Sequence, residues 1–161
     1  EDNQDQIISL AGLAERMNVD VRFIELMPIG CGGEHSGPDA GAALSRLKEA
    51  YPGLAPVREV RGNGPAVYYA DERLLGRIGF ITARSRSFCA GCNRIRLTST
   101  GLVKPCLCDG GTVDLRALIR GGATDGEITA ALENAVWGKP AAHGITGGNV
   151  TERRRMNQIG G

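Results

Sequence analysis

A long stretch of this chain has no acidic residues. From Arg73 to Cys108 the sequence contains no Asp or Glu, although acidic and basic residues nearly balance over the whole chain, at 18 and 19. The same stretch carries seven basic side chains: Arg73, Arg77, Arg84, Arg86, Arg94, Arg96 and Lys104. Positive charge gathered in this way attracts anions, and the arginine fork matches the geometry of phosphate. We therefore expect an anionic ligand near the cysteines of this stretch.

Aromatic residues and long apolar runs are also scarce. Aromatics make up only 4% of the 161 residues, so stacking platforms for single-stranded nucleic acid are few and a compact polyphosphate is the better ligand. No apolar run approaches the ~20 residues of a membrane span, and no stretch resembles a signal peptide. Neither nucleic acid nor a membrane is expected as a partner, and thiols that need not pair suggest the cytoplasm.

Four of the five cysteines fall within Ser87–Asp109. Cys89 and Cys92 form a C-x2-C pair, and thirteen residues separate Cys92 from Cys106. A disulfide framework is disfavoured because the number of cysteines is odd and no export signal is present. A closed zinc site would need Cys108 as its fourth ligand, in an atypical C-x-C spacing. An iron–sulfur cluster held by three thiolates would leave one iron open to a substrate.

The run Arg94–Thr98 alternates between polar and apolar residues, which predicts a strand. Arg94 and Arg96 would share one face of that strand, and Ile95 would point to the other. A turn at residues 99–101 would pair the strand with residues 102–107 and return Cys106 toward the first cysteine pair. A thiol cage beside two guanidinium groups is suited to a metal centre next to an anion.

The remaining periodicity predicts a mixed α/β (α+β) protein. An apolar content of 42% and a charged content of 23% are typical of a globular protein. The near-continuous apolar run at residues 21–26 is typical of a strand covered on both faces. Helices are expected over residues 4–17, 38–50, 113–120 and 124–136, and strands over residues 21–26, 67–70, 74–83, 94–98 and 102–107.

Phe88–Cys106, with the sequence FCAGCNRIRLTSTGLVKPC, closely resembles the C-terminal cluster motif of the GTP 3',8-cyclase family of molybdenum cofactor biosynthesis. Arg22–Gly30 resembles the late barrel strand of the family, and Trp137–Ile145 and Met156–Gly161 resemble further family segments in the same order. The C-x3-C-x2-C motif with which the family begins is absent, and the chain opens with Glu1. We therefore expect this chain to be the C-terminal part of a longer protein.

The resemblance implies a fold. Residues 1–36 would be the last units of an incomplete (β/α) radical S-adenosylmethionine (SAM) barrel. Residues 37–161 would be a C-terminal domain of antiparallel strands and helices, which carries a [4Fe–4S] site and ends in a Gly-Gly tail.

The resemblance also implies an activity: conversion of GTP to (8S)-3',8-cyclo-7,8-dihydroguanosine 5'-triphosphate, the first step of molybdopterin biosynthesis, by a radical SAM lyase. The implied cofactors are a [4Fe–4S] cluster and SAM. The implied partners are GTP and an N-terminal barrel with a first cluster, without which this chain is expected to be inactive. A homodimer is a further option. By resemblance, the site residues are Cys89, Cys92 and Cys106 for the cluster, Arg94, Ile95 and Arg96 for GTP, Met27 for SAM, and Gly160 and Gly161 for the catalytic tail.

Two other functions are compatible with the residues alone. One is a zinc-stabilised module that binds polyanions. The other is an iron–sulfur electron-transfer domain, which needs four protein ligands and would recruit Cys108. The arginine face argues against electron transfer, because it indicates a ligand. Cys31 is expected to be a free thiol, and His143 has no assigned role.

Overall fold

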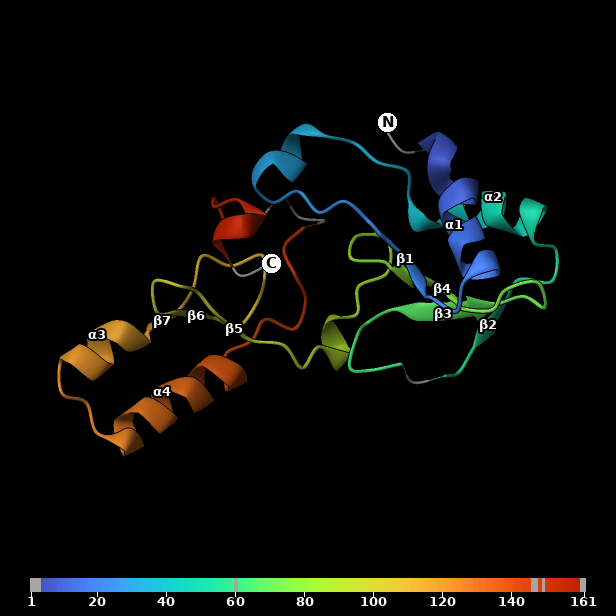
Figure 1. Cartoon of the computed structure of the whole chain (residues 1–161). Helices are drawn as coiled ribbons and strands as arrows, with labels where there is room; N and C mark the ends of the chain where they lie inside the picture. Colours follow the sequence, from blue (N-terminus) through green and yellow to red (C-terminus); the bar gives the residue numbers. More distant parts are fainter. Residues whose placement is uncertain (1–3, 60, 146–147, 149, 160–161) are drawn as a thin grey trace. The chain divides into compact units, whose positions relative to one another are not determined.

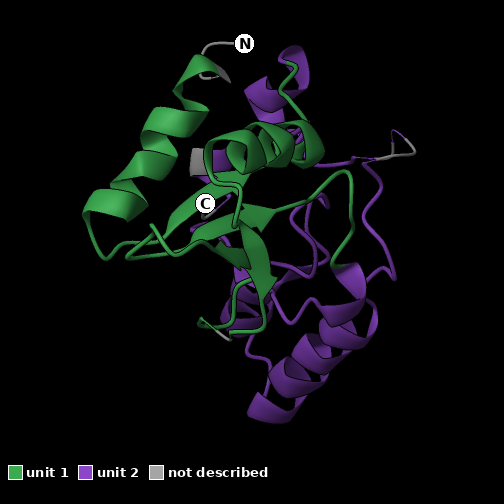
Figure 2. Cartoon of the chain, turned by 90° about the vertical axis from the view of Figure 1, so that its right-hand side faces the viewer, with its two compact units in different colours: residues 1–26, 36–88 green, residues 27–35, 89–161 purple. Residues whose placement is uncertain are grey.

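The computed structural model describes residues 4–59, 61–145, 148 and 150–159 (Figure 1). The chain divides into two compact units, residues 1–26 with 36–88 and residues 27–35 with 89–161 (Figure 2). Each unit has its own sheet and its own helices. The mixed α+β class predicted from the sequence is confirmed, whereas the barrel and the division at residue 36 stay predictions.

The first unit is a four-stranded sheet with two helices. Its strand order is β1-β4-β3-β2, in which β1 runs parallel to β4 and the other pairs are antiparallel. Its elements are the 3-10 turn Gln4–Gln6, α1 (Ile7–Arg16), β1 (Val21–Ile24), α2 (Ala40–Ala50), β2 (Ala55–Val57), β3 (Val67–Ala70) and β4 (Ile78–Ile81).

Both helices of this unit pack over a single apolar core. Ala11 of α1 and Leu47 of α2 are completely buried, and they share this core with Ile78 and Phe80 of β4. The helix predicted at residues 38–50 begins two residues later, at Ala40, because Asp39 is its N-cap and the carboxylate of Asp39 accepts a hydrogen bond from the amide of Ala42 at 2.7 Å. The proposed cap of the first helix, Asn3, lies outside the described residues.

One feature of β1 differs from the sequence prediction. A strand covered on both faces was expected, but its burial alternates, and Ile24 is 58% exposed. The reason is that one face of the strand, with Val21 and Phe23, packs on the core shared with α1 and α2, and the other face does not. Its apolar run therefore marks a strand whose second face is uncovered among the described residues.

The second unit is a three-stranded antiparallel sheet with two helices and several short turns. Its strand order is β5-β6-β7. Its elements are the 3-10 turn Gly30–Glu34, the 3-10 turn Cys89–Gly91, β5 (Arg96–Leu97), β6 (Leu102–Lys104), β7 (Val113–Asp114), α3 (Leu115–Arg120), α4 (Asp125–Trp137) and the 3-10 turn Met156–Gln158.

The hairpin predicted after the first cysteine pair is confirmed, but its strands are shorter than the expected residues 94–98 and 102–107. Arg96 pairs with Lys104 and Leu97 with Val103, and Gly101 supplies the turn with a φ of 87°. The strand β7 was not predicted. It replaces the first two residues of an expected helix, because Asp114 acts as the N-cap of α3 and the helix begins only after it.

The helix α4 has the predicted capping box. The hydroxyl of Thr124 accepts from the amide of Glu127, and the carboxylate of Glu127 accepts from the amide of Thr124 at 2.8 Å. Its buried face centres on Ala135, however, and the predicted face residue Val136 is 45% exposed. In the part of the chain that the structure describes, no helix combines the length and apolar character needed to cross a bilayer.

Candidate functional site

Segments far apart in sequence meet in the second unit. Ile29, Cys108 and Ile159 form a buried apolar cluster, and Met27 and Cys106 both pack against it. One small core thus brings together Met27, the candidate for SAM, Cys106, a candidate cluster ligand, and Ile159, which directly precedes the tail. Gly160 and Gly161, the tail candidates themselves, lie outside the described residues.

Among the described residues, the five cysteines form no disulfide. Cys89, Cys92 and Cys106 are half-buried, Cys108 is buried and Cys31 is exposed. Among the residues that the structure describes, no three His, Cys, Asp or Glu side chains are already placed to hold a metal. The donor chemistry suits an iron–sulfur cluster, since three reduced and partly accessible thiols lie in one unit, but they do not form a finished cage.

Lys139 joins the two arms of the cysteine region. Its ammonium donates hydrogen bonds to the backbone carbonyls of Arg94 and Pro105, the second at 2.9 Å, and lies 3.8 Å from the sulfur of Cys92. One side chain therefore ties the run after the first cysteine pair to the residue before Cys106. No role was predicted for Lys139, whose only signal in the sequence is its place inside a segment that resembles the family.

His143 lies against the first cysteine. Its backbone amide donates to the sulfur of Cys89 at 3.3 Å, and its Nδ1 accepts from the amide of Ile145 at the same distance. Its Nε2 is buried, and among the described residues it has no hydrogen-bond partner. The histidine left without a role thus belongs to the cysteine region.

The two cysteines at the end of the stretch influence each other. A hydrogen bond from Cys108 favours the thiolate of Cys106 and, despite burial, lowers the pKa of Cys106 to about 6, with a smaller contribution from the charge of Lys139. The same hydrogen bond, followed by burial, raises the pKa of Cys108. The hydrogen bond therefore favours the thiolate at Cys106, with Cys108 as its donor.

The arginine face follows the predicted alternation. Arg94 and Arg96 are half-buried, Thr98 is buried, and Ile95 and Leu97 are 45% and 60% exposed. Two of the three GTP candidates thus lie on one side of the run, and Ile95 lies on the other.

Not all the basic residues of the acid-free stretch are available to an anion. Within the described residues, three of the seven have carboxylate partners that come from elsewhere in the sequence. These ion pairs are Arg73 with Glu15 at 3.6 Å, Arg77 with Glu59 at 3.0 Å, and Lys104 with Glu152.

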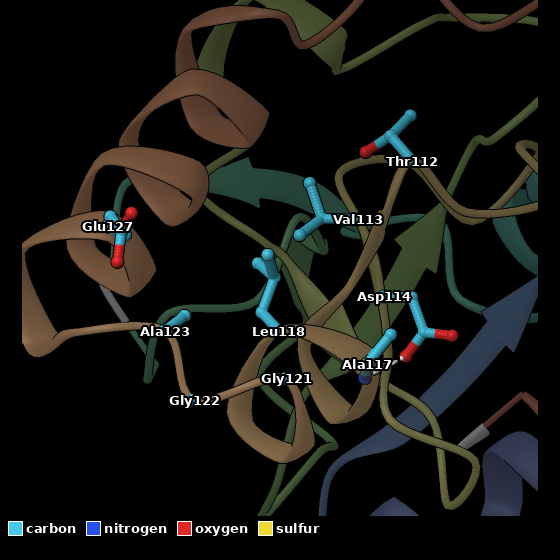
Figure 3. A pocket seen from close by; sticks show the side chains of 9 residues that line it. All are labelled: Thr112, Val113, Asp114, Ala117, Leu118, Gly121, Gly122, Ala123 and Glu127. Carbon is cyan, nitrogen blue, oxygen red and sulfur yellow. Dashed lines mark hydrogen bonds between the residues drawn. The ribbon is translucent and has the colours of Figure 1, made fainter.

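The second unit also has an open hollow of about 620 Å³ between β7, α3 and the start of α4 (Figure 3). It carries two carboxylates, those of Asp114 and Glu127, and both are occupied as helix caps. The hollow is lined by Thr112, Val113, Asp114, Ala117, Leu118, Gly121, Gly122, Ala123 and Glu127, and contains none of the predicted site residues.

Residues 19–145 match the family model described as Molybdenum Cofactor Synthesis C, and the chain belongs to this family. Three similar proteins carry the name GTP 3',8-cyclase. That of Desulforamulus reducens is 41% identical over 162 residues and that of Pelotomaculum thermopropionicum 40% over 162 residues, each covering 99% of this chain and 50% of the relative. That of Paracoccus denitrificans is 40% identical over 145 residues, which cover 88% of this chain and 42% of the relative. The chain spans about half the length of these curated relatives.

Proposed function

We propose that this chain is the C-terminal part of a GTP 3',8-cyclase, which converts GTP to (8S)-3',8-cyclo-7,8-dihydroguanosine 5'-triphosphate in molybdenum cofactor biosynthesis. The observation that carries the proposal is the packing of Met27, Cys106 and Ile159 around one buried core. The name shared by relatives that match 99% of the chain supports it. In this proposal, residues 1–36 end a radical SAM barrel, and residues 37–161 form the domain that binds the cluster and GTP.

We assign the cluster to the thiolates of Cys89, Cys92 and Cys106. A [4Fe–4S] cluster held by three thiolates supplies an open iron at which a substrate atom can bind. Cys108 is left out of the ligand set because it is only 4% exposed and packs with Ile29 and Ile159 in the buried apolar cluster. Lys139 contributes by holding the carbonyl of Arg94, which follows Cys92, and that of Pro105, which precedes Cys106.

In the proposed reaction, the residues of this chain bind and orient GTP. Arg94 and Arg96, two residues apart on one side of the run, are suited to hold the anionic nucleotide by charge-assisted hydrogen bonds, with Ile95 in the same segment. Met27 is assigned to SAM, and Gly160 and Gly161 to the tail that completes the active site. The cofactors of the proposed enzyme are thus the [4Fe–4S] cluster and SAM.

Anaerobic reconstitution with iron and sulfide tests the ligand assignment. The complete protein and this chain should each acquire a [4Fe–4S] spectrum at this site, measured by Mössbauer spectroscopy and by iron and sulfide analysis. Replacing Cys89, Cys92 or Cys106 with Ala should abolish it, and the matched controls Cys31→Ala and Cys108→Ala should retain it.

Two outcomes would point to another function. Tightly bound zinc that resists replacement by iron would favour a polyanion-binding module. Loss of the cluster in Cys108→Ala would indicate four protein ligands and favour electron transfer.

A further inference from the structure

The most deeply buried charge in the second unit belongs to Lys104. Its side chain is completely buried on β6, and its ammonium donates to the carbonyl of Leu107 at 3.2 Å and to the carboxylate of Glu152. A buried ammonium is stable only when it is paired and hydrogen-bonded. Here the partner comes from a residue 48 positions later in the sequence.

Glu152 is also buried and fully hydrogen-bonded. It is 4% exposed, and besides Lys104 it accepts from the backbone amide of Arg154 at 2.7 Å and from the guanidinium of Arg154 at 3.0 and 3.1 Å. Burial favours its neutral form, but the hydrogen bonds from Arg154 and Lys104 outweigh this and lower the pKa of Glu152 to about 2. The carboxylate is therefore ionised at neutral pH and held by two cations.

Backbone hydrogen bonds continue this connection to the loop after Cys106. The carbonyl of Cys108 accepts from the amides of Thr151 and Glu152 at 3.1 and 3.0 Å. The guanidinium of Arg154 donates to the carbonyl of Gly110 at 2.7 Å. The segment that carries Glu152 is therefore hydrogen-bonded to the loop that begins at Cys106.

The C-terminal segment is fixed again farther on. Ile159 is completely buried against Ile29 and Cys108. Gly30, with a φ of 55°, approaches the backbone so closely that a Cβ there would lie 3.0 Å from the Cα of Arg155. The path from Thr151 to Ile159 is thus set by the loop after Cys106 and by the segment after Met27.

We propose that the Lys104–Glu152 ion pair sets the register of the C-terminal segment on the loop that carries Cys106. Both are positioning residues, which hold Cys106 and the segment from Thr151 to Ile159 in one fixed relationship. An ion pair is suited to this task because it is satisfied in one alignment only, whereas apolar contacts tolerate a shift of the chain. The inference deepens the proposed function and rests on it.

Hydrogen exchange of the complete protein, followed by mass spectrometry of the peptides that cover residues 148–159, tests this register directly. Lys104→Met and Glu152→Gln should each speed the exchange of the Thr151 and Glu152 amides at least about tenfold, because the segment opens locally. Arg116→Met is the matched control, since its ion pair with Asp114, at 4.0 Å, is exposed in the same unit. It should leave that exchange unchanged.

The double variant Lys104→Met, Glu152→Met separates positioning from stability. It leaves no unpaired buried charge at these two positions, so its urea midpoint should recover toward that of the original protein. Exchange at residues 151–152 should nevertheless stay fast, and a chelator should remove iron faster. Recovery of the exchange rate together with the midpoint would overturn the proposal, as would single variants with unchanged exchange.

Iron uptake and hydrogen exchange test the proposed function and the register independently. If the unaltered protein takes up no iron under anaerobic reconstitution, the proposed function fails. The exchange of residues 151–152 would still decide whether the ion pair sets the register of the C-terminal segment.

Discussion

The ammonium of Lys139 lies 3.8 Å from the sulfur of Cys92 and holds the carbonyls of Arg94 and Pro105 at the same time. Removing it leaves these half-buried groups without their cationic donor. We expect Lys139→Met to bind iron in reconstitution but to lose it to a chelator at least about tenfold faster, since charge-assisted hydrogen bonds contribute ~1.5–3 kcal/mol each.

Lys48→Met is the control for this prediction, because Lys48 is an exposed lysine near the end of α2. Iron loss should be followed by absorbance under identical anaerobic conditions. Equal rates for both variants would mean that Lys139 does not stabilise the cysteine region.

Arg94 and Arg96 should be needed for the nucleotide. In the complete protein, Arg94→Ala or Arg96→Ala should weaken GTP binding about ten- to a hundred-fold, because each removes a charge-assisted contact of ~1.5–3 kcal/mol. Lysine at either position should restore only part of the affinity, since it keeps the charge and loses the planar fork.

Leu97→Ala is the matched control, because this side chain is 60% exposed on the other side of the run. GTP affinity can be measured by equilibrium dialysis, with iron content checked in every variant. Unaltered affinity in both alanine variants would place the nucleotide elsewhere.

Local signals explain what could be predicted from the sequence. Thr124 and Glu127 predict the start of α4, because a capping box needs only neighbouring residues. The turn at Gly101 likewise predicts the hairpin of β5 and β6. The strands β2 and β7 were missed because, at three and two residues, they are too short to show a strand period.

The candidate site was predicted only in part, for the same reason. The alternation of Arg94 and Arg96 is visible in the sequence, because a strand period is local. The contacts of Lys139 and the burial of Lys104 are not, because a lysine that pairs with a carboxylate 48 residues away looks like any surface lysine until the fold is known.

Gly76 is predicted to be intolerant of any side chain. A Cβ at this position would lie 1.9 Å from the carbonyl oxygen of Val19, so the backbone would have to move. Gly76→Ala should destabilise the first unit by at least ~2 kcal/mol, as an overpacked or displaced core contact does. Gly33→Ala, where nothing lies within 4 Å, should change urea stability little, and similar losses in both would contradict the structural explanation.

The chain by itself should neither cleave SAM nor convert GTP. It lacks the C-x3-C-x2-C cysteines of the first cluster, and β1 has a paired neighbour on one side only among the described strands. An unpaired strand edge with exposed Ile24 also favours association. Product analysis by mass spectrometry after anaerobic incubation tests the first point and light scattering the second. Turnover of GTP by the purified chain would refute this expectation.

Acid should release the ion pair of Glu152. Because the pKa of Glu152 is lowered to about 2 in the folded protein, its contribution to stability is complete above its unfolded pKa, near 4.5, and is lost as the pH falls from about 5 through about 2. This pKa shift corresponds to ~3 kcal/mol of folding stability. Solvent screening does not reduce it, because the side chain of Glu152 is only 1% exposed. Urea unfolding of the original protein and of the Lys104→Met, Glu152→Met variant, measured from pH 7 to pH 3, isolates this contribution from the other carboxylates. Relative to this variant, the original protein should lose stability steadily as the pH falls below 5. A difference that does not change with pH would mean that Glu152 gains nothing from its ionised form in the folded chain.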